Sequence, residues 1–447
     1  MLLIKNAAYV IASADRVFEN TDVLIDGNKI VRVGKSISPD GCSKVIDATG
    51  KMVSPGFINA HTHLYQNMLK GLGDSLRLKE WCEDVTFPFS NIIHKYERQL
   101  GDETLGYAYG LLGAAEMIHS GITAFIDMDT VMDSLFEAWQ DIGIRGVAAV
   151  QSVNRWIPKE LMIPDETRLD HLEKTISKWH NKGLMDVYIA PSTPFACTPA
   201  FMESIQKLSR AYGVKVQIHV SETEWEVNQS LTDVGMTPLA YLDSIGFLDD
   251  PIIAVHCVHL TPEEIELCKS KKITVCYNPK SNGKLGSGIA PIAELYEAGV
   301  DLCLATDGAA SNDLLDIFED MRFGAMLQKL KYGDPARFGE KEIFRMATEG
   351  GAKAMGLNAG RIEPGKLADL IILDLSSPSI APVHDPLSGL VYCGKACHVE
   401  TVIIDGRIVM EEGRIITIDE KCAVADAVAL GKKRFLEAST GPMSSEF

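Results

Sequence analysis

Residues 55–64 read PGFINAHTHL, a short apolar run that ends in two histidines, His61 and His63. Similar runs recur along the chain, and a segment with a helical pattern follows each of them. The later runs are ITAFIDM, RGVAAVQSV, VYIAPST, VKVQIHVSE, IIAVHCVHL, ITVCYNP and DLCLATDG. Nearly continuous Val, Ile, Leu, Ala and Cys is typical of parallel strands that are buried on both faces. Eight strand–helix units from about residue 54 to residue 360 predict an α/β fold, a (β/α)8 barrel of the TIM type.

Two of the helical segments have clear stop signals. They read ETLGYAYGLLGAAEMIHSG and TPAFMESIQKLSRAYG, and they end at Gly121 and Gly213. Glycine is the common residue just beyond the last turn of a helix because it adopts a positive φ without steric cost. We therefore expect these two helices to end at the glycines.

The two ends of the chain have the alternating pattern of antiparallel strands. Residues 1–53 contain LLIKNAAYVI, DVLIDGNKIVRVG and KVIDATGKMV, and residues 365–417 contain KLADLIILDL, VETVIIDGRIVME and GRIITID. Neither end is long enough for a comfortable core of its own. We therefore expect both ends to join in one small β-sandwich beside a barrel of residues 54–364. Residues 365–447 supply its second part and a tail, GPMSSEF, that we expect to be disordered.

Composition excludes several classes of partner. The chain has 447 residues, with 43 Lys and Arg against 61 Asp and Glu, a formal charge of −18. Nucleic acids and anionic membranes attract basic surfaces, so neither is an expected partner. No apolar run approaches the ~20 residues that span a bilayer, and Lys5 interrupts the apolar N-terminus, which argues against a signal peptide. Ten cysteines without a CxxC pair indicate free thiols in a reducing cytoplasm.

Polar residues follow several of the predicted strands, at the ends where catalysis occurs in this kind of barrel. They are His61 and His63, His219 and Glu222, His256, and Asp307. His61 and His63 are two residues apart, so on one strand their side chains leave the same face and can share one metal. Two or three histidines with a carboxylate suit zinc, or iron, better than magnesium.

Each of these residues alone has a simpler interpretation. An HxH pair can be structural, His256 can be a buried hydrogen-bonded histidine, and Asp307 with Gly308 can form only a turn. Four histidines, an aspartate and a glutamate at matching ends of four strands are much harder to explain by chance. Together they favour a metal site.

The segments PGFINAHTHLYQ, HVSETEWEV, AVHCVHLT and LATDGAASND resemble the amidohydrolase superfamily. They are most similar to its branch of aromatic-ring deaminases and triazine hydrolases, which includes the methylthioadenosine/S-adenosylhomocysteine deaminases. The resemblance implies one divalent metal, Zn²⁺ or alternatively Fe²⁺, with the ligands His61, His63, His219 and Asp307. Binuclear relatives need a lysine at the end of strand four, and the corresponding run VYIAPST has none.

The resemblance also implies the roles of the other residues. The metal lowers the pKa of a water molecule, which Asp307 also binds, and the resulting hydroxide attacks a ring carbon. Glu222 protonates a ring nitrogen and then the leaving amine, while His256 polarises the group under attack. Without a metal nearby, Glu222 would be interpreted as a solvated carboxylate at the start of a helix. Trp81 falls where relatives place an aromatic wall against the ring, although it can equally anchor a helix.

The substrate is less clearly indicated. Nucleoside-reading members have Glu, Arg and His where this chain has Ser90, Gln151 and Ser192. We therefore expect a free amino-substituted purine, pterin, pyrimidine or triazine, to which Gln151 and Ser192 can hydrogen-bond, and release of ammonia. The alternatives are a methylthioadenosine/S-adenosylhomocysteine-type nucleoside deaminase, a triazine hydrolase that expels chloride or an alkylamine, and a non-catalytic structural homologue. We further expect a cytoplasmic homo-oligomer.

Overall fold

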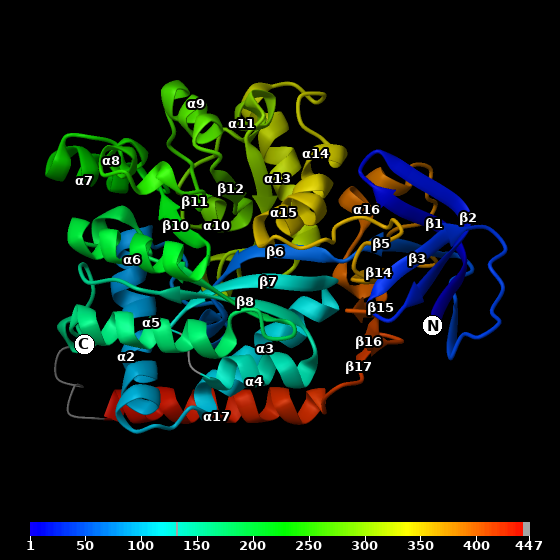
Figure 1. Ribbon diagram of the computed structural model, residues 1–447, viewed down its shortest axis with the longest axis horizontal. Coiled ribbons are helices and arrows are strands. Elements are labelled where there is room, and N and C mark those ends of the chain that lie inside the picture. Colours follow the sequence, from blue (N-terminus) through cyan, green and yellow to red (C-terminus); the bar gives the residue numbers. More distant parts are fainter. Residues whose placement is uncertain (131–132, 441–447) are drawn as a thin grey trace.

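The computed structural model describes residues 1–130 and 133–440, and two sheets organise this part of the chain (Figure 1). One sheet has eight strands, and the other has nine strands taken from both ends of the chain. The tail of residues 441–447, which the sequence predicts to be disordered, lies outside the described residues. Within the described residues, no helix has the length and the apolar character needed to cross a bilayer.

The eight apolar runs form the eight-stranded sheet, in chain order and with every neighbouring pair parallel. Its strands are β6 (Phe57–Thr62), β7 (Ile122–Asp129), β8 (Arg145–Gln151), β9 (Met185–Ala190), β10 (Val216–Val220), β11 (Ile252–His256), β12 (Thr274–Tyr277) and β13 (Asp301–Leu304). The sheet closes where the segment after β13 meets β6. There, the Asp307 N–H donates to the His61 carbonyl at 3.1 Å, and the Thr306 N–H donates to Asn59 Oδ1 at 3.0 Å. The predicted (β/α)8 barrel is confirmed.

Helices connect the strands and cover the outside of the barrel (Figure 1). They are α1 (Leu78–Trp81), α2 (Phe87–Ile93), α3 (Thr104–His119), α4 (Asp133–Ile142), α5 (Asp165–Trp179), α6 (Pro199–Tyr212), α7 (Glu224–Val234), α8 (Pro238–Ser244), α9 (Pro262–Ser270), α10 (Pro279–Lys284), α11 (Ile292–Ala298), α12 (Ala309–Asn312), α13 (Ile317–Tyr332), α14 (Glu340–Arg345) and α15 (Gly351–Met355). The predicted stops hold for α3 and α6. Gly121 and Gly213 follow them with φ of +79° and +69°.

Apolar side chains pack on both sides of the barrel strands, which explains their continuous apolar sequences. On β7, Phe125 packs against Trp139 of α4, with ring centroids 4.9 Å apart, in the layer beneath the helices. The neighbouring residues Ile126 and Met128 belong to a separate buried cluster that also contains Ala149. Because side chains alternate along a strand, this second cluster fills the inside of the barrel.

The nine-stranded sheet joins the two ends of the chain, as predicted. From one edge to the other its order is β17 (Arg414–Ile415), β16 (Arg407–Glu411), β15 (Val399–Ile404), β14 (Leu370–Asp374), β5 (Lys51–Pro55), β1 (Leu2–Ser13), β2 (Arg16–Asp26) and β3 (Lys29–Gly34), with β4 (Lys44–Asp47) also paired to β1. The sheet curls over its own core, because Lys29 pairs with Leu367 and the Ile30 N–H donates to the Lys366 carbonyl at 3.0 Å. The predicted sandwich is therefore one continuous curled sheet.

The curled sheet and the barrel are closely attached. Gly56 alone separates β5 from β6, and its N–H donates to the Asp369 carbonyl at 2.9 Å. A Cβ atom at Gly56 would lie 2.2 Å from Thr123 Cγ2, so only glycine fits there. The buried Arg145, the first residue of β8, forms ion pairs at 3.2 Å with Asp369 and with Asp405 of the curled sheet.

Two further helices follow in the C-terminal segment. α16 (Pro386–Cys393) lies in the connection between β14 and β15, and α17 (Glu420–Thr440) runs back along the barrel beside α3 (Figure 1). α16 packs on α13 and α14, so both C-terminal helices contact helices of the barrel. The division of the chain after residues 53 and 364 stays a prediction.

Candidate metal centre and active site

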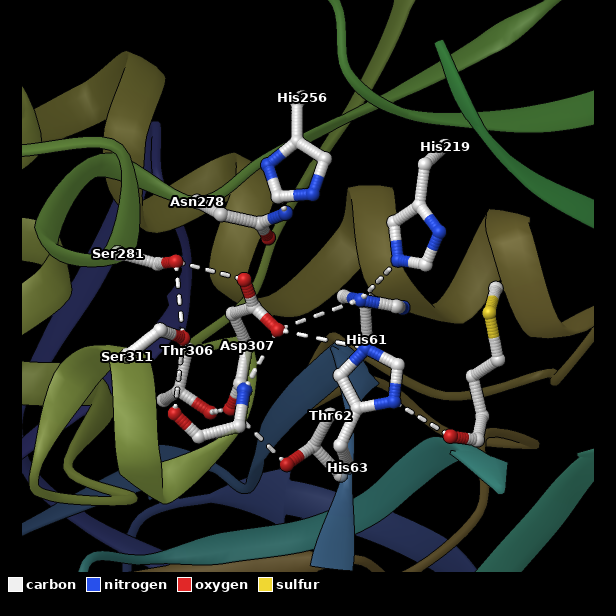
Figure 2. A network of polar contacts seen from close by, with 12 residues as sticks. His61, Thr62, His63, His219, His256, Asn278, Ser281, Thr306, Asp307 and Ser311 are labelled. Atoms are coloured by element: carbon white, nitrogen blue, oxygen red, sulfur yellow. Dashed lines mark hydrogen bonds and ion pairs between the residues drawn. The ribbon is translucent and has the colours of Figure 1, made fainter. Parts of the chain in front are cut away.

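The four predicted metal ligands come together at the carboxyl ends of the barrel strands (Figure 2). His61 Nε2 lies 3.2 Å from His219 Nε2 and 3.5 Å from Asp307 Oδ1. His63 Nε2 is also 3.5 Å from Asp307 Oδ1. Two positions differ from the prediction that these residues end strands. His63 is one residue beyond β6, and Asp307 lies in a turn three residues after β13, with φ of +63°.

Hydrogen bonds fix the orientation of the three imidazole rings. Each Nδ1 contacts an oxygen that can only accept, so Nδ1 carries the ring proton and the lone pair of Nε2 faces the centre. The acceptors for His61, His63 and His219 are Gln217 Oε1 at 3.0 Å, the Met128 carbonyl at 2.5 Å and the Ser192 carbonyl at 2.9 Å. Acceptors of this kind are typical partners of metal-binding histidines.

These residues fit a divalent metal ion. Two nitrogen lone pairs, on His61 and His219, lie 3.2 Å apart with no hydrogen between them, an arrangement that a cation stabilises. The possible ligand atoms of His61, His63 and His219 all lie within 4.8 Å of one another, as do those of His61, His256 and Asp307. A set of imidazole nitrogens and one carboxylate suits zinc or iron.

Burial favours the forms of these side chains that bind metals. It lowers the pKa of His63 to about 4, with a further contribution from the neighbouring His61, and it holds the pKa of His219 well below its usual range. Both rings are therefore neutral at pH 7. Ser281 Oγ and the Gly308 N–H each donate to the Asp307 carboxylate at 2.6 Å, and such bonds stabilise its charged form.

Glu222 lies beside the cluster, in the turn between β10 and α7, and only 4% of its surface is exposed. Its Oε2 is 3.5 Å from His256 Nε2, and its Oε1 accepts a hydrogen bond from Ser287 Oγ at 3.2 Å. Burial, together with the negative charges of Asp307 and Glu226, raises the pKa of Glu222 well above its usual range. A solvated carboxylate is therefore the wrong interpretation, since Glu222 is a buried acid whose surroundings favour the protonated form.

His256 is the last residue of β11 and is almost completely buried. Its Nδ1 contacts the side-chain amides of Asn278 and Asn282 at 3.2 and 2.9 Å. Burial lowers the pKa of His256 to about 3. A neutral ring therefore presents Nε2 to the space between Glu222 and the predicted metal ligands.

A cavity of about 150 Å³ opens onto this cluster, and its wall includes all the substrate-contacting residues predicted from the sequence. These are Trp81, Gln151, Ser192, Glu222 and His256, and the wall also contains Ser90. Only 5% of the Trp81 surface is exposed, so this side chain can line the cavity and anchor its helix at the same time. Gln151 Nε2 donates to Ser192 Oγ at 3.3 Å, and Ser90 Oγ donates to the Thr86 carbonyl at 2.9 Å. Ser90, Gln151 and Ser192 therefore each form a hydrogen bond within the protein.

The cavity wall also contains residues that the sequence did not indicate. They are Tyr65, Phe87, His94, Trp156, Arg168 and Phe195. Three of them form an aromatic cluster, in which Trp156 lies 4.9 Å from Phe195 and 5.6 Å from Phe87 between ring centroids. All six come from connections after the strands, where no periodic pattern marks a residue as facing the site.

A closed barrel with a cluster of imidazole and carboxylate groups at the carboxyl ends of its strands is the arrangement of a metal-dependent barrel enzyme. The family model described as "Amidohydrolase family" matches residues 52–409. This chain belongs to the amidohydrolase family.

Similar proteins are named as deaminases. The chain is 38% identical to a 5-methylthioadenosine/S-adenosylhomocysteine deaminase of Thermoanaerobacter pseudethanolicus, over 94% of this chain and 95% of that protein. It is 37% identical to a 5′-deoxyadenosine deaminase of Methanosphaera stadtmanae, over 92% and 94%. Its fold matches the crystal structure of a Xanthomonas campestris adenosine deaminase with bound zinc, with a TM-score of 0.89, 30% identity and coverage of 97% and 98%.

Proposed function

We propose that this chain is a zinc-dependent deaminase that hydrolyses the exocyclic amino group of an adenine nucleoside and releases ammonia. The observation that carries the proposal is the position of Glu222, a buried carboxyl group 3.5 Å from His256 Nε2 in the wall of the cavity that also contains His63, His219 and Asp307. Relatives with more than a third of their residues in common are named as deaminases of such nucleosides. The enzyme is a hydrolase of carbon–nitrogen bonds in cyclic amidines.

The residues have separate tasks in this reaction. His61, His63, His219 and Asp307 hold the metal, which when bound lowers the pKa of water towards neutrality and so supplies a nucleophile. Glu222 donates its proton to the ring nitrogen next to the carbon under attack, takes up the proton of the attacking water, and passes it to the leaving amine. His256 Nε2 lies where it can bind the oxygen that adds to the ring. Trp81 packs against the ring in the wall of the cavity.

A free heterocycle is the competing substrate, and one observation favours it. Ser90 and the pair Gln151 and Ser192 already make hydrogen bonds within the protein, so they are not simple replacements for ribose-binding groups. In favour of a nucleoside, His94 and Arg168 add polar side chains to the same cavity. The choice between the two depends on whether these groups contact a ribose.

Ammonia release by the purified zinc enzyme tests the proposal. The panel consists of adenosine, 5′-deoxyadenosine, methylthioadenosine and S-adenosylhomocysteine against adenine, guanine, a pterin, cytosine and amino-triazines. We expect the best nucleoside to exceed every free heterocycle in kcat/KM by about tenfold or more, a difference of about 1.4 kcal/mol. A free heterocycle with the higher value would instead support the competing substrate. Release of chloride from chlorotriazines without deamination would reject both, because chloride needs no proton from Glu222.

We also propose that the enzyme is a cytoplasmic homo-oligomer that binds neither nucleic acid nor membranes. All ten cysteines are free thiols, which suits a reducing compartment, and the net charge of −18 disfavours polyanions. Phe323, Met326 and Leu330 are exposed on α13, and such a row of apolar side chains is typical of a contact between subunits. Light scattering coupled to gel filtration tests the assembly, with Leu330→Glu expected to weaken it.

A further inference from the structure

We propose that Glu226 is a positioning residue that holds the backbone of Glu222 in its working conformation. The proposal rests on the proposed function, in which Glu222 is the proton donor. Glu226 lies in the first turn of α7 and is 2% exposed. Within the described part of the chain, its carboxylate makes no hydrogen bond or ion pair to His61, His63, His219 or Asp307. Its contacts are instead with the turn that carries Glu222.

The two oxygens of Glu226 bind two successive peptide groups. Oε1 accepts a hydrogen bond from the Ser221 N–H at 3.1 Å, and Oε2 accepts one from the Glu222 N–H at 2.7 Å. In a usual capping box, the glutamate of the first turn binds the N–H of the capping residue itself. Here the capping residue is Thr223, whose Oγ1 accepts from the Glu226 N–H at 3.2 Å. The carboxylate therefore reaches one and two residues further back, to the turn.

This turn needs support because its backbone is strained. Ser221 has φ of +51°, a left-handed conformation that is unfavourable for a residue with a Cβ. Its carbonyl accepts from the N–H groups of Val258 and His259, both at 3.0 Å, so the peptide is held from the opposite side as well. Both N–H groups bound by Glu226 belong to fully or almost fully buried residues, where an unpaired donor is costly.

The position of the Glu222 carboxyl depends directly on this turn. The Glu222 carboxyl contacts His256 Nε2 at 3.5 Å, at the end of β11, and Ser287 Oγ at 3.2 Å, in the connection after α10. A rotation of the peptide between residues 221 and 222 would move the carboxyl away from both. Because a displacement of about 1 Å can reduce a rate by about 10²-fold, the pair of bonds from Glu226 affects turnover without contacting the substrate's reacting atoms.

The substitution Glu226→Gln tests this role with little change in volume. The amide keeps one acceptor oxygen but turns its NH₂ group towards the second backbone N–H, so one of the two bonds is lost. We expect kcat to fall about 10- to 100-fold while KM changes less than about threefold and the metal content stays at one equivalent. Hydrogen exchange of the Ser221 and Glu222 amides should become faster.

Glu264→Gln is the matched control. Glu264 is 4% exposed, lies in the first turn of α9, and its Oε2 accepts from the Thr261 N–H at 2.9 Å in a capping box. The same chemical change there removes the same kind of bond away from Glu222. We expect a comparable loss of thermal stability with normal kcat and normal exchange at residues 221 and 222.

Three outcomes would overturn the role of Glu226. They are a normal kcat in Glu226→Gln, an equal loss of kcat in both variants, or unchanged exchange of the two amides. Hydrogen exchange requires no substrate, so it decides the structural part even if no adenine compound is hydrolysed. If no adenine compound is hydrolysed, the proposed function is wrong, and the exchange experiment still tests whether Glu226 holds the turn.

Discussion

Replacement of Glu222 by glutamine removes the proposed proton donor and leaves its surroundings nearly unchanged. Glutamine has the same shape, and its oxygen can still accept the hydrogen bond from Ser287 Oγ that Glu222 accepts at 3.2 Å. Within the described part of the chain, the four predicted metal ligands make no hydrogen bond to Glu222, so metal content and melting temperature should stay the same. Only the ability to donate and take up a proton is lost.

The expected loss follows from this single change. General acid–base groups contribute about 10²–10⁴-fold, which corresponds to about 3–5 kcal/mol of transition-state stabilisation. We therefore expect kcat to fall by that factor in a steady-state assay of ammonia release, with KM little changed. Glu224→Gln is the control, because Glu224 is exposed at the start of α7 and should retain full activity. A Glu222→Gln enzyme with one metal per chain and a near-normal rate across pH would refute the assignment.

Three further predictions concern the metal and the attachment of the curled sheet. Metal analysis should give about one equivalent per chain, chelation should abolish turnover, and zinc should restore it; two equivalents, or activity without metal, would contradict a single-metal site. Ser281→Ala removes the 2.6 Å hydrogen bond to Asp307 Oδ2 and should weaken metal affinity or activity about 10- to 100-fold, measured by competition with a chelator. Arg145→Met leaves buried Asp369 without its ion pair and should lower the free energy of unfolding by about 3–5 kcal/mol, seen as a lower denaturation midpoint with unchanged kcat. A loss below about 1 kcal/mol would mean that this pair does not hold the sheet to the barrel.

Much of the fold could be predicted because the barrel strands have an unusual sequence. Burial on both faces requires continuous apolar runs, and all eight runs form strands of one parallel sheet. The joining of the two chain ends was also predictable, since neither end could bury enough surface alone. The curl of the sheet was not, because it depends on a contact between residues 29 and 367 that no local pattern encodes.

The candidate site also has one part that the sequence predicts and one part that it does not. The residues predicted as ligands lie on or beside strands, where spacing and strand ends mark them, and they come together in one cluster. Gln217 could have been predicted as their neighbour, since it is two residues before His219 and shares its face. The cavity wall was largely missed. Arg168 lies in α5, far along the chain from the strand that precedes it, and Trp156 lies in an irregular connection. Such side chains reach the site through loop conformation, which sequence periodicity does not record.

A barrel whose first strand begins one residue after a strand of the neighbouring sheet cannot be exchanged between relatives as a separate module. A recombination point at Gly56 would break the path from β5 to β6, and a longer join there would move β6 out of register with β7. A side chain at Gly56 would collide with Thr123, so even a point substitution needs a compensating change on the barrel. Sequence changes are therefore tolerated best in the connections after the strands. New residues there alter the cavity wall and leave the positions of the barrel strands unchanged.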